Sequence, residues 1–402
     1  MLRQLISLLA VCILMPGPCT AAITFLGKAE VSGTDTDLSG LTDILEDGTP
    51  HNRLGGHGSG IDYTGSGNTY VMCADRGPAD GASSYRCRLQ FADISVALQG
   101  TKRRVEIKPV STLMLTDSSG RPLIGGSWAF GDGRRFDPEG VRVSAEGTIL
   151  VSDEYGPSIL EFDSSGRASG RRIKVPSRFE VDHPAASPDE ELASNRKGRQ
   201  PNRGMEGLAI SPDGRHLWGI MHSPLIQDGA VDSQGRRVGV NVRILRIDLL
   251  TGETGEFVYV LDDPSYGISE ILAVSDSTFL VVERDGKSGS NARRKTIMRI
   301  DVTGATDVSH IESLPSGHLP QGIVPVGKTL FIDLLSVEYG LSGDSFPQKI
   351  EGLTFGPDLP DGRRLLVITS DNDFIASNPT VVLVFAVEAE ELTRPLRRIP
   401  KH

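Results

Sequence analysis

The stretch Gly204-Met-Glu-Gly-Leu-Ala-Ile210, followed by Ser211-Pro-Asp-Gly-Arg-His-Leu-Trp-Gly-Ile-Met-His222, decides the fold. A Glu, a small residue and an apolar strand lead through a glycine-bearing turn into a second strand with a polar end. The phrase recurs at Phe136–Glu154 and Lys349–Asn372, and in shorter form at Glu270. A supersecondary unit repeated at spacings of several tens of residues is typical of a stacked or radial repeat architecture.

Each unit holds three or four short strands, which is the content of a propeller blade. The chain has 402 residues with 46 Gly and 24 Pro, as many short strands joined by tight turns require. We therefore predict an all-β fold with a single β-propeller of six blades. Five or seven blades are the alternatives, because the unit at Pro320–Asp333 is degenerate. The strand at Ile23–Val31 is predicted to pair with Val381–Val387 and close the ring.

The N-terminus has the pattern of a secretory signal peptide. A short basic region, Met1–Arg3, precedes the apolar run Leu5–Met15, which is too short to span a bilayer comfortably, and small residues follow at Cys19–Ala22. We expect a signal peptide over residues 1–22, a propeller domain over 23–402, and a secreted or periplasmic protein. No other segment is long and apolar enough to cross a membrane.

Removal of that peptide would leave two cysteines, Cys73 and Cys87. In an oxidising compartment a lone pair at this spacing predicts a disulfide, which would add roughly 3 kcal/mol by closing its loop. The alternative is two free thiols in adjacent strands. Lipidation at Cys19 is a further alternative, disfavoured by Pro16 and Pro18 where small residues would be needed.

The formal net charge is −10 and the sequence pI is about 5.4. No basic patch is evident, which argues against nucleic acid and anionic membrane surfaces as partners. The acidic balance fits a secreted protein or a cation binder. We expect a monomer that acts on a small molecule.

A carboxylate precedes the first strand of four units, and a propeller directs its inner strands into the central channel. We expect these glutamates to converge at one mouth of the channel and to bind a metal ion: Glu139, Glu206, Glu270 and Glu351. Ser59 and Gln321 replace Glu in the remaining two units. Oxygen-rich ligation favours Ca²⁺, then Mg²⁺ or Mn²⁺, and the lack of a His/Cys cluster argues against zinc.

A second set of polar residues follows the next strand of each unit and should lie beside the first. The candidate catalytic residues are Asp153, Glu154, Asp371, Asp373 and His222. The candidate substrate-binding residues are Arg76, Arg203 and Arg284. The alternative is structural, because acidic residues in blade turns often bond backbone amides or pair with an Arg of the next blade. The charged insertion Glu180–Arg203 is either a lid or a solvated loop.

Several phrases carry a resemblance to a known family: Ala74-Asp-Arg-Gly-Pro78, Asp137-Pro-Glu-Gly140, Val151-Ser-Asp-Glu-Tyr155, Asn202-Arg-Gly-Met-Glu-Gly-Leu208, Lys349-Ile-Glu-Gly-Leu353 and Ser370-Asp-Asn-Asp-Phe374. Over nearly all of the mature chain they resemble the phytase-like domain family, whose members are often labelled "esterase-like activity of phytase". The resemblance implies a secreted or periplasmic β-propeller rich in Glu and Asp. It also implies a phosphoesterase role, by analogy with calcium-dependent β-propeller phytases.

Three hypotheses follow. The first is a calcium-dependent hydrolase of phosphate esters. The second is a lactonase or esterase of the gluconolactonase type, which also uses a carboxylate-bound metal in a propeller. The third is a non-catalytic propeller that binds a ligand or a protein. The same acidic ring would serve all three.

Overall fold

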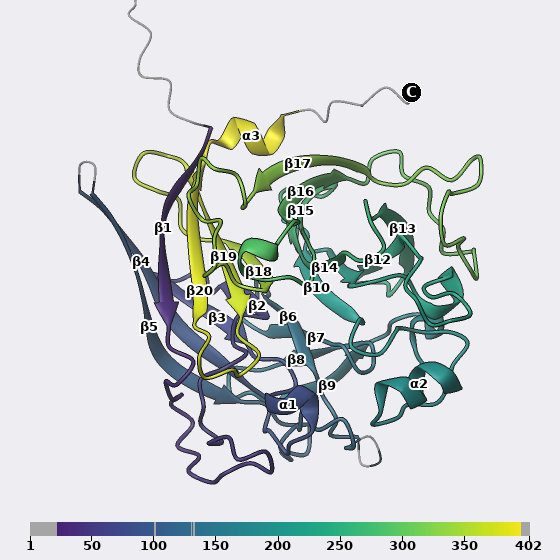
Figure 1. Cartoon of the computed structure of the whole chain (residues 1–402), viewed down its shortest axis with the longest axis horizontal. Coiled ribbons are helices and arrows are strands. Elements are labelled where there is room, and N and C mark those ends of the chain that lie inside the picture. The colour runs from purple at the N-terminus through teal and green to yellow at the C-terminus, as the bar shows by residue number, and fades with distance from the viewer. Residues whose placement is uncertain (1–21, 100–101, 130, 132, 395–402) are drawn as a thin grey trace, which may run out of the picture.

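The computed structural model describes residues 22–99, 102–129, 131 and 133–394. These residues form five antiparallel sheets of four strands each, arranged around one axis (Figure 1). The predicted all-β propeller is confirmed, and the predicted count of six blades is wrong. From the inside outward, the strands of blade one are β2 (Gly60–Tyr63), β3 (Thr69–Cys73), β4 (Arg88–Gln99) and β5 (Lys102–Met114).

The other four blades repeat this order of strands, and the last of them takes its outer strand from the N-terminal end of the described chain. Blade two consists of β6 (Pro138–Val143), β7 (Ile149–Asp153), β8 (Ser158–Phe162) and β9 (Ala168–Ile173). Blade three consists of β10 (Met205–Ile210), β11 (His216–Met221), β12 (Asn241–Asp248) and β13 (Thr254–Val260). Blade four consists of β14 (Gly267–Ala273), β15 (Thr278–Arg284), β16 (Lys295–Asp301) and β17 (Gly327–Asp333). Blade five consists of β18 (Lys349–Phe355), β19 (Arg364–Asp371), β20 (Thr380–Val387) and β1 (Ile23–Val31).

The sixth blade was predicted from a stretch that belongs to blade four. Strand β17 pairs antiparallel with β16, with Gly327 opposite Asp301 and Asp333 opposite Thr296. The residues before it, 320–326, form no strand. A long loop between β16 and β17 therefore separates the outer strand from the other strands of its blade in the sequence. As a result, the segment around β17 resembles the start of a new unit.

The ring closes as predicted. Strand β1 pairs antiparallel with β20, from Ile23 opposite Val387 to Val31 opposite Thr380. The last blade thus takes its outer strand from the first described residues. The predicted signal peptide, residues 1–22, lies outside the described residues apart from Ala22.

Helical segments are short and lie in the connections. They are α1 (Pro78–Gly81), α2 (Pro188–Ser194), α3 (Ala389–Thr393) and the 3₁₀ turns Ser177–Phe179, Ile226–Asp228 and Gly289–Asn291. Helix α2 lies in the charged insertion, and Ser187 caps it by accepting from Glu190 N. Across the described ranges, no helix is long and apolar enough to cross a membrane.

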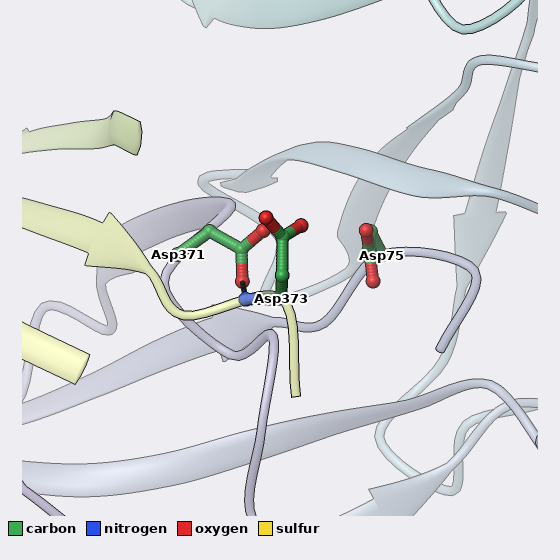
Figure 2. Close-up of side chains that lie close together, drawn as sticks. All are labelled: Asp75, Asp371 and Asp373. Carbon is green, nitrogen blue, oxygen red and sulfur yellow. Dashed lines mark hydrogen bonds between the residues drawn. The ribbon is translucent and has the colours of Figure 1, made fainter. Parts of the chain in front are cut away.

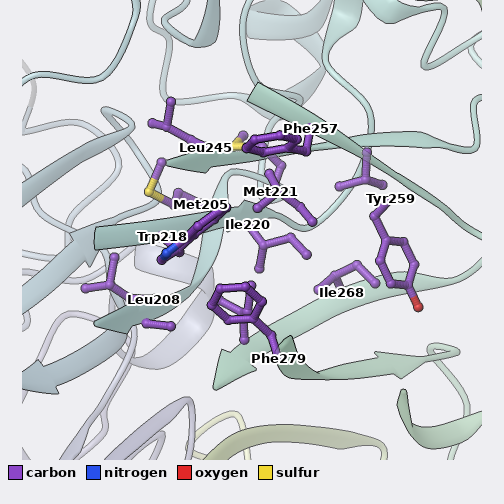
Figure 3. Close-up of a cluster of buried hydrophobic side chains, with 14 of the residues drawn as sticks. Met205, Leu208, Trp218, Ile220, Met221, Leu245, Phe257, Tyr259, Ile268 and Phe279 are labelled. Atoms are coloured by element: carbon purple, nitrogen blue, oxygen red, sulfur yellow. The ribbon is translucent and has the colours of Figure 1, made fainter. Parts of the chain in front are cut away.

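Apolar side chains between neighbouring sheets hold the blades together. At the junction of blades three and four, Trp218 of β11 packs against Phe279 of β15, with ring centroids 4.8 Å apart (Figure 3). Phe257 of β13 lies against the same indole at 5.7 Å. All three rings are buried. Because such large rings fill the space between sheets, each blade has a fixed position relative to the next.

The predicted disulfide is not formed in the structure. Cys73 of β3 lies opposite Leu89 of β4. Cys87 precedes Leu89 by two residues, so it is not the cross-strand neighbour of Cys73. Each thiol is free and buried, and each donates to a separate backbone carbonyl, Cys73 to Glu139 and Cys87 to Phe136. The prediction rested on the compartment and not on geometry, and the alternative of two thiols is the one observed.

Candidate active site

A bulge in the inner strands directs the repeated glutamates toward the channel mouth. In β10 the paired residues pass from Met205 directly to Gly207, so Glu206 is an extra residue in the ladder. Such a bulge bends the strand and changes the direction of one side chain. The glycine is required by close approach, since a Cβ on Gly207 would lie 2.6 Å from Ile271 N of the next blade.

Three of the four predicted glutamates meet at one pocket of about 190 Å³. Glu139, Glu206 and Glu351 each come from the bulge of a different inner strand, and all are less than 10 % exposed. The pocket is lined by Asp75, Arg76, Glu139, Asn202, Arg203, Glu206, His222, Arg237, Ser265, Gly267, Arg284, Gly286, Gln348, Lys349 and Glu351.

Glu270 does not reach this pocket. In β14 the paired residues pass from Ile268 to Glu270, so the bulged residue is Ser269, and Ser269 is the structural equivalent of Glu206. The prediction that Glu270 is the site residue of this strand is therefore wrong by one position. A shift of one residue in a strand places the side chain on the other face, and Glu270 is fully buried there.

Glu270 belongs instead to a set of bonds in the middle of the channel. Its Oε1 accepts from Leu208 N at 3.0 Å and from Ile271 N at 2.9 Å, and its Oε2 lies 3.1 Å from Arg142 Nη2. Arg142 of β6 also donates to carbonyl oxygens of three other inner strands, those of Ile61, Ile271 and Leu353. The Arg142–Glu270 pair therefore joins the inner strands and has a structural role.

Arg76, predicted to hold substrate, is occupied by acidic neighbours. Its Nη1 lies 2.8 Å from Asp137 Oδ2 and 3.2 Å from Glu154 Oε2, and its Nη2 donates to Asn202 Oδ1. Glu154 is also held by Gly204 N, at 2.7 Å from Oε1. Burial opposes ionisation of Glu154, but Arg76 and this N–H outweigh it, and the pKa of Glu154 falls below its usual value. Arg76 thus lines the pocket as one member of a fixed ion pair with Glu154.

A second acidic group contains Asp75, Asp371 and Asp373, whose carboxylate oxygens lie within 4.8 Å of one another (Figure 2). Lys349 neutralises two of them, with Nζ 3.0 Å from Asp371 Oδ2 and in contact with Asp373. Among the described residues, no Lys or Arg lies within 4.0 Å of the Asp75 carboxylate. Burial, and then Asp371, raise its pKa to about 8.

The remaining predicted catalytic residues lie away from the pocket. Asp371 and Asp373 line a neighbouring cavity of about 320 Å³, which shares Gln348 with the first. Asp153 accepts from Asp137 N at 3.1 Å and from Ser158 Oγ at 3.1 Å, so it braces the turn after β7. This contact is the structural alternative given above for acidic residues in blade turns.

His222 and Glu206 form a close pair inside the pocket, with Nδ1 3.2 Å from Oε1. Burial, then the nearby Arg203 and Arg284, lower the pKa of His222 well below its usual value. Burial, then Glu154 and Glu351, raise the pKa of Glu206 well above its usual value. Both shifts favour the neutral forms, a protonated carboxyl and an uncharged imidazole.

Three guanidinium groups face this pair. Arg284 is bonded to Glu351 Oε1 at 2.5 Å and to Ser269 Oγ at 2.9 Å. Within the described residues, Arg203 and Arg237 have no carboxylate partner within 4.0 Å, and Arg237 donates only to Ser265 O. Burial, then Arg237, lower the pKa of Arg203 to about 10. Two partly buried cations without an anion make this side of the pocket a place for a negatively charged group.

Sequence reasoning missed several residues of the site, for identifiable reasons. Arg237 ends a polar insertion between β11 and β12 that showed no motif. Lys349 stands directly before a repeated Ile-Glu-Gly phrase, and Asp137 directly before Pro-Glu-Gly, so repeat register could have indicated both. Nothing in the sequence indicated the contact between Asn202 and Arg76.

The chain matches, over residues 52–374, the family described as "Phytase-like: Esterase-like activity of phytase". It belongs to this family. The matched region runs from the loop before β2 to the polar residues after β19, so it contains every residue of the pocket. The predicted resemblance is confirmed.

One relative among known proteins is a chain of Arthroderma benhamiae named "Uncharacterized secreted protein". It is 27% identical over 447 residues, which cover 84% of this chain and 86% of the relative.

Solved propellers show more distant similarity. A gluconolactonase from Xanthomonas campestris is 12% identical with a TM-score of 0.38, covering 90% of this chain and 91% of that one. The calcium-binding protein regucalcin from Agrobacterium tumefaciens is 13% identical with a TM-score of 0.34, covering 82% and 90%. These similarities are too distant to indicate a substrate or a metal.

Proposed function

We propose that this protein is a hydrolase of phosphate esters and that the channel-mouth pocket is its active site. One observation carries the proposal. The pocket places Arg203 and Arg237, which have no carboxylate partner among the described residues, beside the buried Glu206–His222 pair. The first feature suits an anionic substrate, and the second suits proton transfer during hydrolysis.

The anionic half of the substrate would lie between Arg203, Arg237 and Arg284. A guanidinium presents a planar set of N–H donors that matches phosphate oxygens two at a time. Charge on the phosphoryl group would also offset the burial penalty of Arg203, whose pKa is lowered to about 10. Arg76 would be held at the edge of the pocket by Asp137 and Glu154, and it would not bind substrate.

His222 would take a proton from the attacking water, since the lowered pKa favours an uncharged imidazole that can accept. Glu206, with a raised pKa, would supply a proton to the leaving oxygen. A single pair 3.2 Å apart can thus return to its starting state after one turnover.

A divalent cation fits beside this pair. Glu139 is 6% exposed and, among the described residues, has no hydrogen-bond donor. Burial, then Glu206, raise its pKa well above its usual value. Asp137, Glu139 and Glu154, whose carboxylate oxygens lie within 4.8 Å of one another, would hold the cation, with Ca²⁺ the first candidate because every donor is an oxygen. When bound, it would neutralise charge on the phosphoryl oxygens and acidify a coordinated water.

A substrate panel tests the proposal. Phosphomonoesters, phosphodiesters, lactones and carboxylic esters would be assayed with Ca²⁺, Mg²⁺ or Mn²⁺ and with chelator. We expect turnover of phosphate esters that chelator abolishes. Turnover of lactones alone would favour the lactonase alternative, and turnover of none would favour a binding protein.

Neighbouring arginines supply a matched pair of variants. Arg237→Gln should raise the KM for a phosphate ester by about tenfold, since one of three charged contacts is lost. Arg236→Gln should leave KM unchanged, because Arg236 is 71% exposed and pairs with Asp232. Equal effects of the two variants would remove Arg237 from the site.

We further propose that the protein is exported after cleavage of a signal peptide over residues 1–22. The N-terminal pattern and the name of the Arthroderma benhamiae relative support this. The N-terminal sequence of the exported protein should begin near Ile23. An exported chain that still begins at Met1 would contradict the proposal.

A further inference from the structure

A second cavity lies directly beside the active-site pocket. It has a volume of about 260 Å³ and shares two lining residues with the first pocket, Arg76 and Asn202. The bond from Arg76 Nη2 to Asn202 Oδ1 therefore forms the partition between them. Asn202 adopts a left-handed conformation, with φ of 55°, and its side chain is exposed.

Uncharged side chains make up seven of the twelve residues that line this cavity. Tyr155 forms one side, and its hydroxyl donates to Gly125 O at 2.8 Å, which fixes the ring. The facing wall comes from the charged insertion and consists of small or apolar side chains. They are Ala185, Ala186, Pro188 and Pro201.

Charged groups in these walls already have partners. Arg199 lies 2.5 Å from Glu191, and both are almost fully buried. Arg76 is held by Asp137 and Glu154, and Arg135 stacks on the Tyr155 ring at 3.7 Å. Arg203 and Arg237 differ from these residues, because they have no carboxylate partner among the described residues. The first pocket therefore presents charged groups to a ligand, and the second presents apolar side chains.

From this contrast we infer that the second cavity binds the alcohol half of the substrate, and that this half is an uncharged, ring-sized apolar group. The inference rests on the proposed hydrolysis of phosphate esters, because it assigns the two halves of such an ester to two adjoining cavities. An apolar cavity of about 150 Å³ is enough to hold a benzene ring. The charged insertion Glu180–Arg203 then contributes to both halves, with Arg203 in the first pocket and Ala186 in the second.

Two non-hydrolysable ligands separate the halves. Benzylphosphonate and methylphosphonate carry the same anion and differ only in the apolar group. By titration calorimetry we expect the wild-type protein to bind benzylphosphonate about 10- to 100-fold more tightly, the gain from burying one ring. Equal affinities would overturn the inference.

Substitutions on the insertion locate the ring. Ala186→Phe fills the cavity, so it should bring the two affinities together while leaving that for methylphosphonate unchanged. Ala193→Phe is the control, since Ala193 is exposed on α2 and does not line the cavity. A benzyl preference that survives in Ala186→Phe would overturn the assignment to this cavity.

Benzyl alcohol keeps the test independent of the anion site. We expect saturable binding to the wild-type protein in ligand-observed NMR, absent in Ala186→Phe. If neither phosphonate binds but benzyl alcohol does, the proposed phosphate-ester activity fails and the apolar cavity stands. If methylphosphonate binds but benzyl alcohol does not, the anion site stands and the inference fails.

Discussion

The middle and the mouth of the channel contain the same kinds of residue in opposite states. In the middle, Glu270 accepts from two backbone N–H groups and forms an ion pair with Arg142, which donates to three neighbouring inner strands. At the mouth, Glu139 has no hydrogen-bond donor within the described part of the chain, and Arg203 has no carboxylate partner there. Removal of one member of a buried ion pair leaves the other charge uncompensated, whereas a buried charge that has no partner is available for a ligand. In this propeller, a charged residue with a structural role therefore differs from one with a functional role in whether it has a partner, more than in its residue type.

The largest effect is expected from breaking the pair in the middle. Glu270→Gln should lower the free energy of unfolding by about 3 kcal/mol, because the buried Arg142 guanidinium loses the carboxylate oxygen that lies 3.1 Å from its Nη2. Urea denaturation measures this. The folded fraction should retain affinity for divalent cations and for phosphonates. Loss of ligand binding without loss of stability would show that Glu270 serves the site after all.

The same substitution at the mouth should act on activity. Glu206→Gln should reduce kcat by about 100-fold, since Gln cannot supply a proton. Its free energy of unfolding should change by less than about 1 kcal/mol, because a neutral carboxyl is replaced by a neutral amide of the same size. Parallel kinetics and denaturation on the two Gln variants measure both. Equal stability losses in both variants would remove the distinction between middle and mouth.

The pH dependence of stability probes the unpaired carboxyls. The pKa of Asp75 is raised to about 8 in the folded protein, above its unfolded value. The folded state therefore keeps a proton that the unfolded state releases, so the contribution of Asp75 makes the folded state less stable as pH rises toward 8. In chelator we expect a decline of about 1 kcal/mol per pH unit from pH 6 to 8.

Asp75→Asn removes the titrating group, so its stability should depend less on pH over the same range. Added Ca²⁺ should flatten the wild-type profile if a cation neutralises the mouth. A wild-type profile that rises from pH 6 to 8 would contradict the raised pKa.

The smallest effect should come from Ser269, the residue at the glutamate position of blade four. Ser269→Ala removes one hydrogen bond to Arg284 Nε and should cost about 1 kcal/mol in unfolding free energy. It should also raise the KM for a phosphate ester a few-fold, because Arg284 loses one of its two supports. Steady-state kinetics would check this. An unchanged KM would show that Glu351 alone positions Arg284.

The repeated phrases were sufficient to predict the propeller, the closure by β1 and three of the mouth glutamates. They failed where one residue decided the outcome. Glu270 in Ser269-Glu270 resembles the Glu of the repeated Glu-Gly phrase, but the bulged residue of this strand is Ser269. Gly327–Asp333 imitates a new unit because a long loop precedes it. Local pattern does not report which strand a segment joins, since pairing depends on distant residues.

The site was predicted less completely for a related reason. Arg237 reaches the pocket from an insertion without periodicity. Arg76 was expected to bind substrate, but Asp137, Glu154 and Asn202 engage it from other segments. Whether a charge is free is a property of the assembled structure, so the sequence identified the right residue types and could not assign which were unpaired.

The closure of blade five by β1 has a consequence for biogenesis. The sheet combines residues near both ends of the chain, so the ring cannot be sealed until β20 has left the ribosome. Until then β1 and β19 lack their shared neighbour β20, and unpaired strand edges favour aggregation. Because the contact between Ile23 and Val387 spans almost the entire chain, its formation should be a late and slow event in folding. A chaperone that shields strand edges would therefore be most valuable in the interval between synthesis and sealing.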